Sequence, residues 1–358
     1  MRHEIKSIQF LRFIAASLVV FTHSMLAIVH SVSADSPSLL YLGEFGGAGV
    51  HIFFVISGFI MVYTSFQKES GNFSSPNFIL KRFIRIFPIY WIYAAASLIV
   101  YRSFYEGYSR SLSEIIGSIL LLPSYSSMLI PQGWTLSFEL YFYICFACFM
   151  LCGLFSGLLT MTLFFLTSVT VGLFFPFDNA GFHLVTNSLL LEFLIGAWTG
   201  YFFVKGSKLG ATLSNGLLVI ALAGFVGSFA FGYNRLPTVL TLGVPSALLI
   251  AGSVFKERCG NLPRLAQRLS FLGDSSYSLY LTHWLLISVL PKAFFMPFAN
   301  PVYFLPFCVA YTLLSIVIAI VLYELLERRL VRSLQAIVKH TKDKGKSSRA
   351  QISSQTQR

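Results

Sequence analysis

Residues 8–30 read IQFLRFIAASLVVFTHSMLAIVH. This run is long and apolar enough to cross a bilayer, yet it carries Arg12 near its start and His23 eleven residues later. Ionisable side chains are costly inside a bilayer and mark functional positions there. At a rise of about 1.5 Å per residue, His23 lies about 16 Å further along a helix than Arg12, and about three full turns place both on one face. We therefore interpret this segment as a transmembrane helix around whose arginine and histidine the chain is organised.

The remaining sequence has the composition of a membrane protein. Of its 358 residues, 56% are hydrophobic and only 11% are charged, whereas a soluble domain carries about 25% charged residues. Apolar runs of about 20 residues recur along the chain, as membrane-spanning helices require. They predict an all-α, polytopic integral membrane helical bundle of about ten transmembrane helices, with approximate bounds 8–30, 47–66, 83–102, 134–152, 157–176, 184–204, 213–233, 236–255, 271–291 and 302–325.

The basic residues predict the orientation of these spans. All but four of the 26 Lys and Arg residues fall on one side of the predicted membrane, and the exceptions are Arg102, Arg110, Arg235 and Lys292. Because Lys and Arg accumulate in cytoplasmic loops, both termini are expected in the cytoplasm. Topology thus accounts for the net charge of +12 without a nucleic-acid partner. We expect residues 1–327 to form the transmembrane domain and residues 328–358 a basic, disordered cytoplasmic tail.

Two short segments have alternative interpretations. Arg2, Lys6, the apolar run and the small residues before Asp35 have the order of a cleavable signal peptide. Cleavage would remove His23, and we favour a retained helix because Arg12 and His23 interrupt the apolar core. In a soluble protein, the CxxC spacing of residues 145–148 would suggest a metal or redox site. Within a membrane span we interpret these cysteines as small apolar residues, and no metal is expected.

A basic cluster precedes the third span. Lys81 and Arg85 are four residues apart and Arg82 and Arg85 three apart, so all can share one helix face. The cluster is either a topology signal or a cytoplasmic anion site, for which the planar fork of arginine suits phosphate.

Further polar groups lie inside the spans. Glu139 has no neighbouring base in the sequence, so its partner must come from another helix. His283 is a second intramembrane histidine, and Trp134 offers an aromatic face to a sugar near the outer side. The roles of His51 and Glu192 stay open.

Taken together, these segments resemble the acyltransferase 3 family of membrane sugar O-acyltransferases, and most of all the bacterial members that modify exopolysaccharide. The matching pieces extend over nearly the full length: Arg12 with ten residues to His23, Gly49-Val50-His51-Ile52-Phe53-Phe54-Val55-Ile56-Ser57-Gly58, Arg82-x-x-Arg85-Ile86-Phe87-Pro88-x-Tyr90, Trp134-x-Leu136-x-x-Glu139 with Tyr143, and Ser276-Tyr277-x-x-Tyr280-x-x-His283. Two positions depart from the family pattern. His51 stands where the family often has an acidic residue, and Glu327-Arg328-Arg329 stands where many members have Glu-Arg-Pro.

The resemblance implies a ten-helix protein of the bacterial cytoplasmic (inner) membrane. Such a protein takes an acyl group, usually acetyl, from acyl-coenzyme A in the cytoplasm and transfers it to a hydroxyl of a polysaccharide or lipid-linked oligosaccharide. It also implies that His23 is essential and that Arg12 and the Arg82-x-x-Arg85 motif serve the active site and the donor. Acetyl-CoA is therefore the expected acyl-donor substrate.

These observations give a hypothetical site. We assign donor binding to Arg12, Lys81, Arg82 and Arg85, catalysis to His23 and Glu139, and substrate binding to Trp134 and His283. His23 acts as a general base or carries the acyl group itself, and Glu139 orients the histidine, raises its basicity or binds the acceptor. A transporter or flippase of a glycan or lipid-linked intermediate is the rival hypothesis, because intramembrane ionisable groups also line substrate pathways. An assembly partner of a polysaccharide synthase is a third.

Overall fold

The computed structural model describes residues 4–32, 45–66, 73–124, 128–293 and 303–340. These residues form helices and no β-strand. The α-helices are α1 (Lys6–Val32), α3 (Ala48–Phe66), α4 (Ser75–Phe104), α5 (Leu112–Ile119), α6 (Gly133–Phe149), α7 (Leu154–Phe174), α8 (Ala180–Thr186), α9 (Leu190–Val204), α10 (Ala211–Phe231), α11 (Val244–Arg258), α12 (Arg264–Leu269), α13 (Ser276–Ala293) and α14 (Phe304–Leu322). Short 3₁₀ and π segments adjoin them: η1 (Phe45–Gly47), η2 (Met150–Cys152), η3 (Tyr233–Arg235), η4 (Val239–Gly243), η5 (Ser270–Ser275) and η7 (Tyr323–Glu327).

Within the described residues, nine helical segments are long and apolar enough to cross a membrane. They coincide with nine of the predicted spans. The other predicted span, 271–291, corresponds to α13, which begins at Ser276; the residues before it belong to the short segment η5. The prediction of an all-α, polytopic membrane bundle is therefore confirmed.

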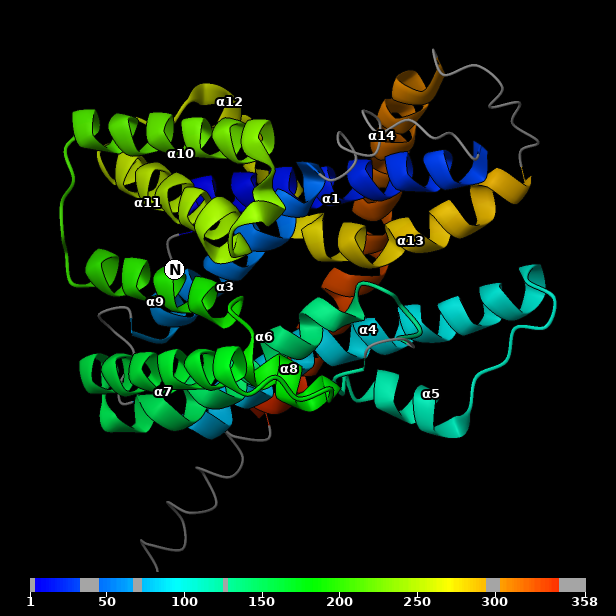
Figure 1. Ribbon diagram of the computed structural model, residues 1–358, viewed down its shortest axis with the longest axis horizontal. Coiled ribbons are helices and arrows are strands. Elements are labelled where there is room, and N and C mark those ends of the chain that lie inside the picture. Colours follow the sequence, from blue (N-terminus) through cyan, green and yellow to red (C-terminus); the bar gives the residue numbers. More distant parts are fainter. Residues whose placement is uncertain (1–3, 33–44, 67–72, 125–127, 294–302, 341–358) are drawn as a thin grey trace, which may run out of the picture.

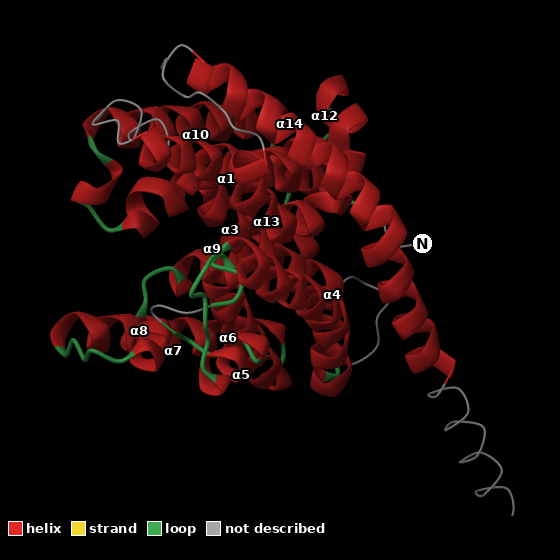
Figure 2. Ribbon diagram, turned by 90° about the vertical axis from the view of Figure 1, so that its right-hand side faces the viewer, coloured by secondary structure: helices red, strands yellow, loops and turns green. Residues whose placement is uncertain are grey.

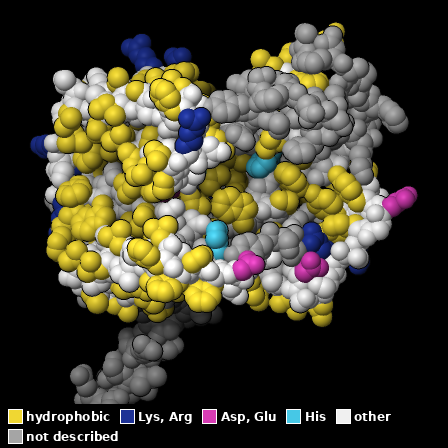
Figure 3. Space-filling view, viewed as in Figure 1, with side chains coloured by type: hydrophobic (Ala, Val, Ile, Leu, Met, Phe, Trp, Pro, Cys, Tyr) yellow, Lys and Arg dark blue, Asp and Glu magenta, His cyan; other side chains and the backbone are white. Residues whose placement is uncertain are grey.

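The long helices form two groups around a central pair. In Figure 1, helices α1, α10, α11 and α13 lie above α3 and α9, and helices α4, α6 and α7 lie below them; Figure 2 shows the same order for those of these helices that it labels. Helix α14 crosses the others at a steep angle (Figure 1). Hydrophobic side chains cover most of the described surface in Figure 3, as contact with lipid requires. Leu173, Phe174 and Phe231 are each at least 74% exposed on this bundle.

Small residues allow the central helices to approach closely. A Cβ atom at Gly196 of α9 would lie 2.0 Å from the Val55 carbonyl oxygen of α3, and one at Gly58 of α3 would lie 1.9 Å from that of Phe193. Such contacts are possible only where glycine exposes the backbone. Gly196 and Gly200, four residues apart on α9, therefore act as a packing motif against α3.

The start of α1 is held by another helix. Glu257, near the end of α11, accepts hydrogen bonds from the backbone N–H groups of Lys6 (2.9 Å) and Ser7 (2.7 Å). The first N–H groups of a helix lack intrahelical partners, and a carboxylate there also complements the helix dipole. This contact fixes the end of α1 from which Arg12 projects.

The last helix continues past the predicted boundary of the tail. The chain is helical from Phe304 to His340, so the predicted start of a disordered tail at residue 328 falls inside a continuous helix. Leu330 packs against the main hydrophobic core, and Arg328 pairs with Glu324 one turn earlier. These contacts explain why the helix persists there. Residues 341–358 of the predicted tail lie outside the described residues.

Candidate active site

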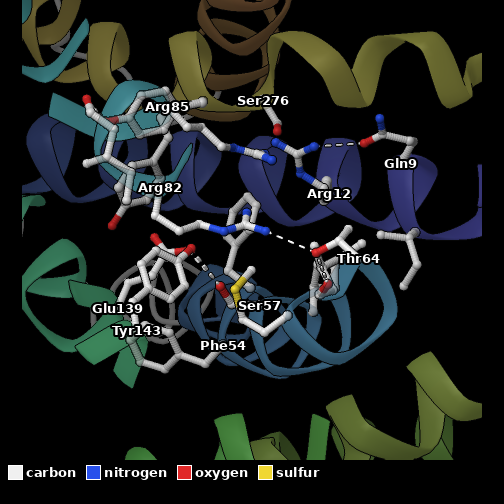
Figure 4. A pocket seen from close by; sticks show the side chains of 18 of the residues that line it. Gln9, Arg12, Phe54, Ser57, Thr64, Arg82, Arg85, Glu139, Tyr143 and Ser276 are labelled. Atoms are coloured by element: carbon white, nitrogen blue, oxygen red, sulfur yellow. Dashed lines mark hydrogen bonds between the residues drawn. The ribbon is translucent and has the colours of Figure 1, made fainter. Parts of the chain in front are cut away.

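A cavity of about 300 Å³ lies among α1, α3, α4, α6 and α13. Figure 4 shows three arginines that point into it, Arg12 from α1 and Arg82 and Arg85 from α4. The structure thus brings together residues that are up to 73 positions apart in the sequence. Lys81 is exposed and is not among the residues that line this cavity, although the sequence grouped it with the arginines.

Two of the arginines are oriented by neighbouring polar side chains. Arg12 Nη1 donates a hydrogen bond to Gln9 Oε1 (2.8 Å), and Gln9 Nε2 donates in turn to Asp274 Oδ1 (2.7 Å). Arg82 Nη2 donates to Thr64 Oγ1 (3.1 Å) (Figure 4). Guanidinium groups that are oriented in this way at a cavity suit the binding of phosphate or carboxylate oxygens.

Asp274 lies in η5, outside the membrane-spanning helices, at the Arg12 end of the cavity. Burial raises the pKa of its carboxyl above the ordinary value, and the nearby Glu4 raises it further. Arg12, Arg85 and Arg328 oppose this rise without cancelling it.

Glu139 also lines the cavity, on the side of the arginines. Its Oε1 accepts a hydrogen bond from Ser57 Oγ (2.6 Å) and another from the Tyr143 hydroxyl (Figure 4). The guanidinium carbon of Arg82 lies 5.6 Å from the centre of the Tyr143 ring. The partner that the sequence required from another helix is thus Ser57 of α3, and the described contacts of this carboxylate do not include His23.

The two intramembrane histidines form one hydrogen-bonded pair. His23 Nδ1 of α1 lies 3.1 Å from His283 Nε2 of α13, and the two rings stack with centroids 5.1 Å apart. His283 is fully buried. Gln132, just before α6, places its Nε2 atom 2.8 Å from the same His283 nitrogen. Sequence reasoning assigned His283 to substrate binding and did not include Gln132 at all, since an amide before a helix carries no motif signal.

One layer of side chains separates the cavity from this pair. Tyr280 and Thr135 line the cavity, and their side-chain oxygens lie 2.7 Å apart. The Tyr280 hydroxyl also donates to the Gln132 carbonyl oxygen (3.3 Å), and its ring centre is 6.0 Å from that of His283. The arginine cavity and the histidine pair therefore adjoin one another across the Tyr280–Thr135 contact.

Other polar residues of the spans lie elsewhere. Trp134 is 41% exposed and packs edge-on against Phe138, outside the cavity lining. His51 Nδ1 lies 2.6 Å from Glu192 Oε1, and this buried pair joins α3 to α9. An ionisable group buried in a membrane needs a partner, so the sequence indicated that His51 and Glu192 each have one. It did not indicate that they pair with each other.

Fold and site together define a multi-pass membrane protein with an arginine-lined internal cavity beside a buried histidine pair. A family model described as an acyltransferase domain matches residues 5–323. The chain belongs to this acyltransferase 3 family, as its motifs predicted, and is thereby an acyltransferase.

One curated relative adds to this assignment. The chain is similar to the exopolysaccharide production protein ExoZ of Rhizobium meliloti (strain 1021), with 32% identity over 257 residues that cover 69% of this chain and 78% of ExoZ. No solved structure matches the chain significantly.

Proposed function

We propose that this protein transfers an acyl group, acetyl in the first instance, from acyl-CoA to a sugar hydroxyl of a bacterial exopolysaccharide or its lipid-linked precursor. Membership of the acyltransferase 3 family supports acyl transfer, and similarity to an exopolysaccharide production protein supports a polysaccharide acceptor. The observation that carries the choice of donor is the cavity in which Arg12, Arg82 and Arg85 converge beside the His23–His283 pair.

The lining of the cavity supports coenzyme A as the donor. The nucleotide end is polyanionic, and the guanidinium groups bind its phosphates through paired N–H donors. The thin acyl-bearing arm then extends along α1, where about 16 Å separates the levels of Arg12 and His23. Glu139, held by Ser57 and Tyr143, accepts an amide N–H of that arm. We thus place Glu139 on the donor side of the site.

His23 performs the chemistry at the far end of the arm. As a general base, its imidazole removes the proton of the acceptor hydroxyl while the oxygen attacks the thioester carbonyl; the C–S bond breaks, and the CoA thiolate takes up the proton. As a nucleophile, the same imidazole takes the acyl group before passing it to the hydroxyl. Both routes require the thioester to pass the Tyr280–Thr135 contact that closes the cavity.

The orientation follows from the positive-inside pattern. The Arg12 end of α1 lies at the same side as most basic residues, so donor phosphates enter from the cytoplasm. We place the protein in the bacterial inner membrane, with the histidine pair nearer the outer face, where the glycan is accessible.

Acceptor-dependent release of CoA tests the proposal. Detergent-solubilised protein is incubated with acetyl-CoA and purified exopolysaccharide repeat units, and free thiol is measured over time. Wild type should release thiol only when the acceptor is present, and His23→Ala should not. A transporter catalyses no bond change in detergent. A wild-type protein that cleaves neither acetyl-CoA nor any other acyl-CoA tested, with the acceptor present, would therefore contradict the proposal.

A further inference from the structure

The hydrogen bonds around His283 determine where its protons lie. His283 Nδ1 is 3.0 Å from the Leu279 carbonyl oxygen, which only accepts hydrogen bonds, so Nδ1 carries a proton. A second proton at Nε2 would make the ring a cation. Such a charge is costly at a fully buried position without a carboxylate against it. His283 is therefore neutral, with a lone pair at Nε2.

Two groups donate to that lone pair. Gln132 Nε2 lies 2.8 Å away and presents an N–H, which fixes the orientation of the amide. His23 Nδ1 lies 3.1 Å away, so it too must carry its proton. A neutral imidazole has one N–H, and His23 consequently keeps its lone pair at Nε2, away from His283.

We infer that His283 and Gln132 are positioning residues, which hold His23 as the Nδ1–H tautomer and thereby expose its Nε2 lone pair to the substrate. The inference rests on the proposed function and assigns a role that neither the family match nor the relative provides. When His23 Nε2 takes a proton or an acyl group, positive charge develops on the ring. The Nδ1–H bond to His283 then strengthens and stabilises that charge.

A neutral acceptor fits this depth in the membrane. The usual orienting partner of a catalytic histidine is a carboxylate, but the buried carboxylates of the described spans have other partners. Glu139 accepts from Ser57, Glu192 pairs with His51, and Glu327 accepts from Ser278. A second imidazole supplies the same lone pair without the cost of a buried anion.

Gln132 itself is fixed from the cavity side. Its backbone carbonyl oxygen accepts hydrogen bonds from Thr135 Oγ1 (3.0 Å) and the Tyr280 hydroxyl (3.3 Å). Its side-chain Oε1 is buried and has no hydrogen-bond partner among the described residues. Retaining an unpaired buried acceptor costs stability. An apolar side chain would avoid that cost, so the amide is explained by what its N–H does for His283.

Four variants test the inference through the split between turnover and donor binding. His283→Leu removes the acceptor, His283→Gln restores an oxygen near the Nε2 position, and Gln132→Met removes the amide at similar volume. Thr282→Val is the matched control. Thr282 is also buried on α13, but its side-chain hydrogen bond among the described residues stays within its own helix, to the Ser278 carbonyl. For each variant we would measure kcat, KM for acetyl-CoA, and protection by acetyl-CoA against thermal unfolding.

His283→Leu should lower kcat about 100-fold or more, because an incorrectly oriented His23 no longer acts as a base. KM for acetyl-CoA and the protection by acetyl-CoA against thermal unfolding should stay within about twofold of wild type. His283→Gln should recover about tenfold of that loss, Gln132→Met should lose about tenfold in kcat, and Thr282→Val should match wild type. His283→Leu with wild-type kcat would overturn the inference. So would a loss of kcat accompanied by an equal loss of donor binding and no rescue by His283→Gln, because that pattern marks a structural role.

These outcomes are distinct from failure of the proposed function. If His23→Ala is inactive and His283→Leu is fully active, acyl transfer at His23 stands and the positioning role falls. If wild type itself releases no CoA, the proposed function is overturned and the positioning role with it.

Discussion

His23 Nδ1 lies 3.1 Å from His283 Nε2, so two histidines 260 residues apart in the sequence form one hydrogen-bonded pair between α1 and α13. The pair adjoins a cavity into which Arg12, Arg82 and Arg85 point. This arrangement separates a region suited to binding an anion from a region suited to moving a proton. Substitutions at the two ends should therefore affect different kinetic constants.

The arginines should determine the affinity for the donor. Arg82→Lys together with Arg85→Lys keeps both charges but removes the planar forks that bind two phosphate oxygens at once. We expect KM for acetyl-CoA to rise about tenfold with kcat little changed. Steady-state kinetics would check this, and Lys208→Gln, which alters an exposed basic residue outside the cavity lining, is the control. Unchanged donor dependence in the double variant would make the two arginines topology signals only.

Glu139 should also act through donor binding. Glu139→Gln keeps the shape but replaces a charged acceptor that holds Ser57 and Tyr143. We expect a rise of about tenfold in KM for acetyl-CoA and a change in kcat below about threefold. A comparison of acetyl-CoA with acetyl-pantetheine tests whether Glu139 contacts the arm. Both donors contain the arm, so Glu139→Gln should raise KM for both by the same factor. A large loss of kcat at saturating donor would instead place Glu139 in the chemical step.

Asp274 should make stability depend on pH. Its pKa is raised in the folded protein, so the folded state binds more protons than the unfolded chain between the ordinary and the raised value. The contribution of this group to stability is present below the ordinary pKa and is lost as pH rises through the folded-state pKa. Asp274→Asn stays neutral, so its Tm should fall less than that of wild type as pH rises from the ordinary carboxyl pKa through the raised one.

Thermal unfolding in detergent at several pH values measures this difference. Asp178→Asn, which removes an exposed carboxyl group, controls for the loss of one negative charge. Equal Tm changes with pH in wild type and Asp274→Asn would refute the role of Asp274.

The His51–Glu192 pair should stabilise the fold without taking part in transfer. Removing one partner leaves the other buried and unpaired, which costs about 3–5 kcal/mol. Glu192→Leu should therefore lower Tm markedly, and His51→Leu combined with Glu192→Leu should be more stable than either single variant. Activity per folded molecule should persist in the double variant. Its loss despite a restored Tm would assign the pair to the reaction.

Hydropathy was sufficient to predict the spans, because each membrane helix needs about 20 apolar residues whatever its neighbours are. It also isolated Arg12 and His23, since ionisable groups stand out in apolar runs. The partners could not be predicted. Whether His283 meets His23 or a substrate depends on how α13 is rotated against α1, and that rotation is set by packing across the whole bundle.

Packing also explains why single residues differ from the roles that the sequence predicted for them. Lys81 and Arg85 share a helix face by spacing, but the cavity begins beyond Lys81. Glu139 required a partner on another helix, as the sequence indicated, and the structure supplies Ser57. Polarity suggested a tail from residue 328, but Leu330 packs on the core and the helix continues. A single apolar residue in a basic segment, such as Leu330, is not enough to predict a packed helix from the sequence.

The role of His23 in acyl transfer can be measured with acetyl-CoA that is radiolabelled in the acetyl group. Wild type and His23→Ala are each incubated with and without the exopolysaccharide acceptor, after equal folding is confirmed by thermal unfolding and by donor protection. We expect label in the acceptor with wild type and none with His23→Ala, although the donor protects both proteins against thermal unfolding. Label that stays on wild-type protein without acceptor would identify the acyl-histidine route, and its absence the direct route. Transfer by His23→Ala at the wild-type rate would show that His23 does not carry out the reaction.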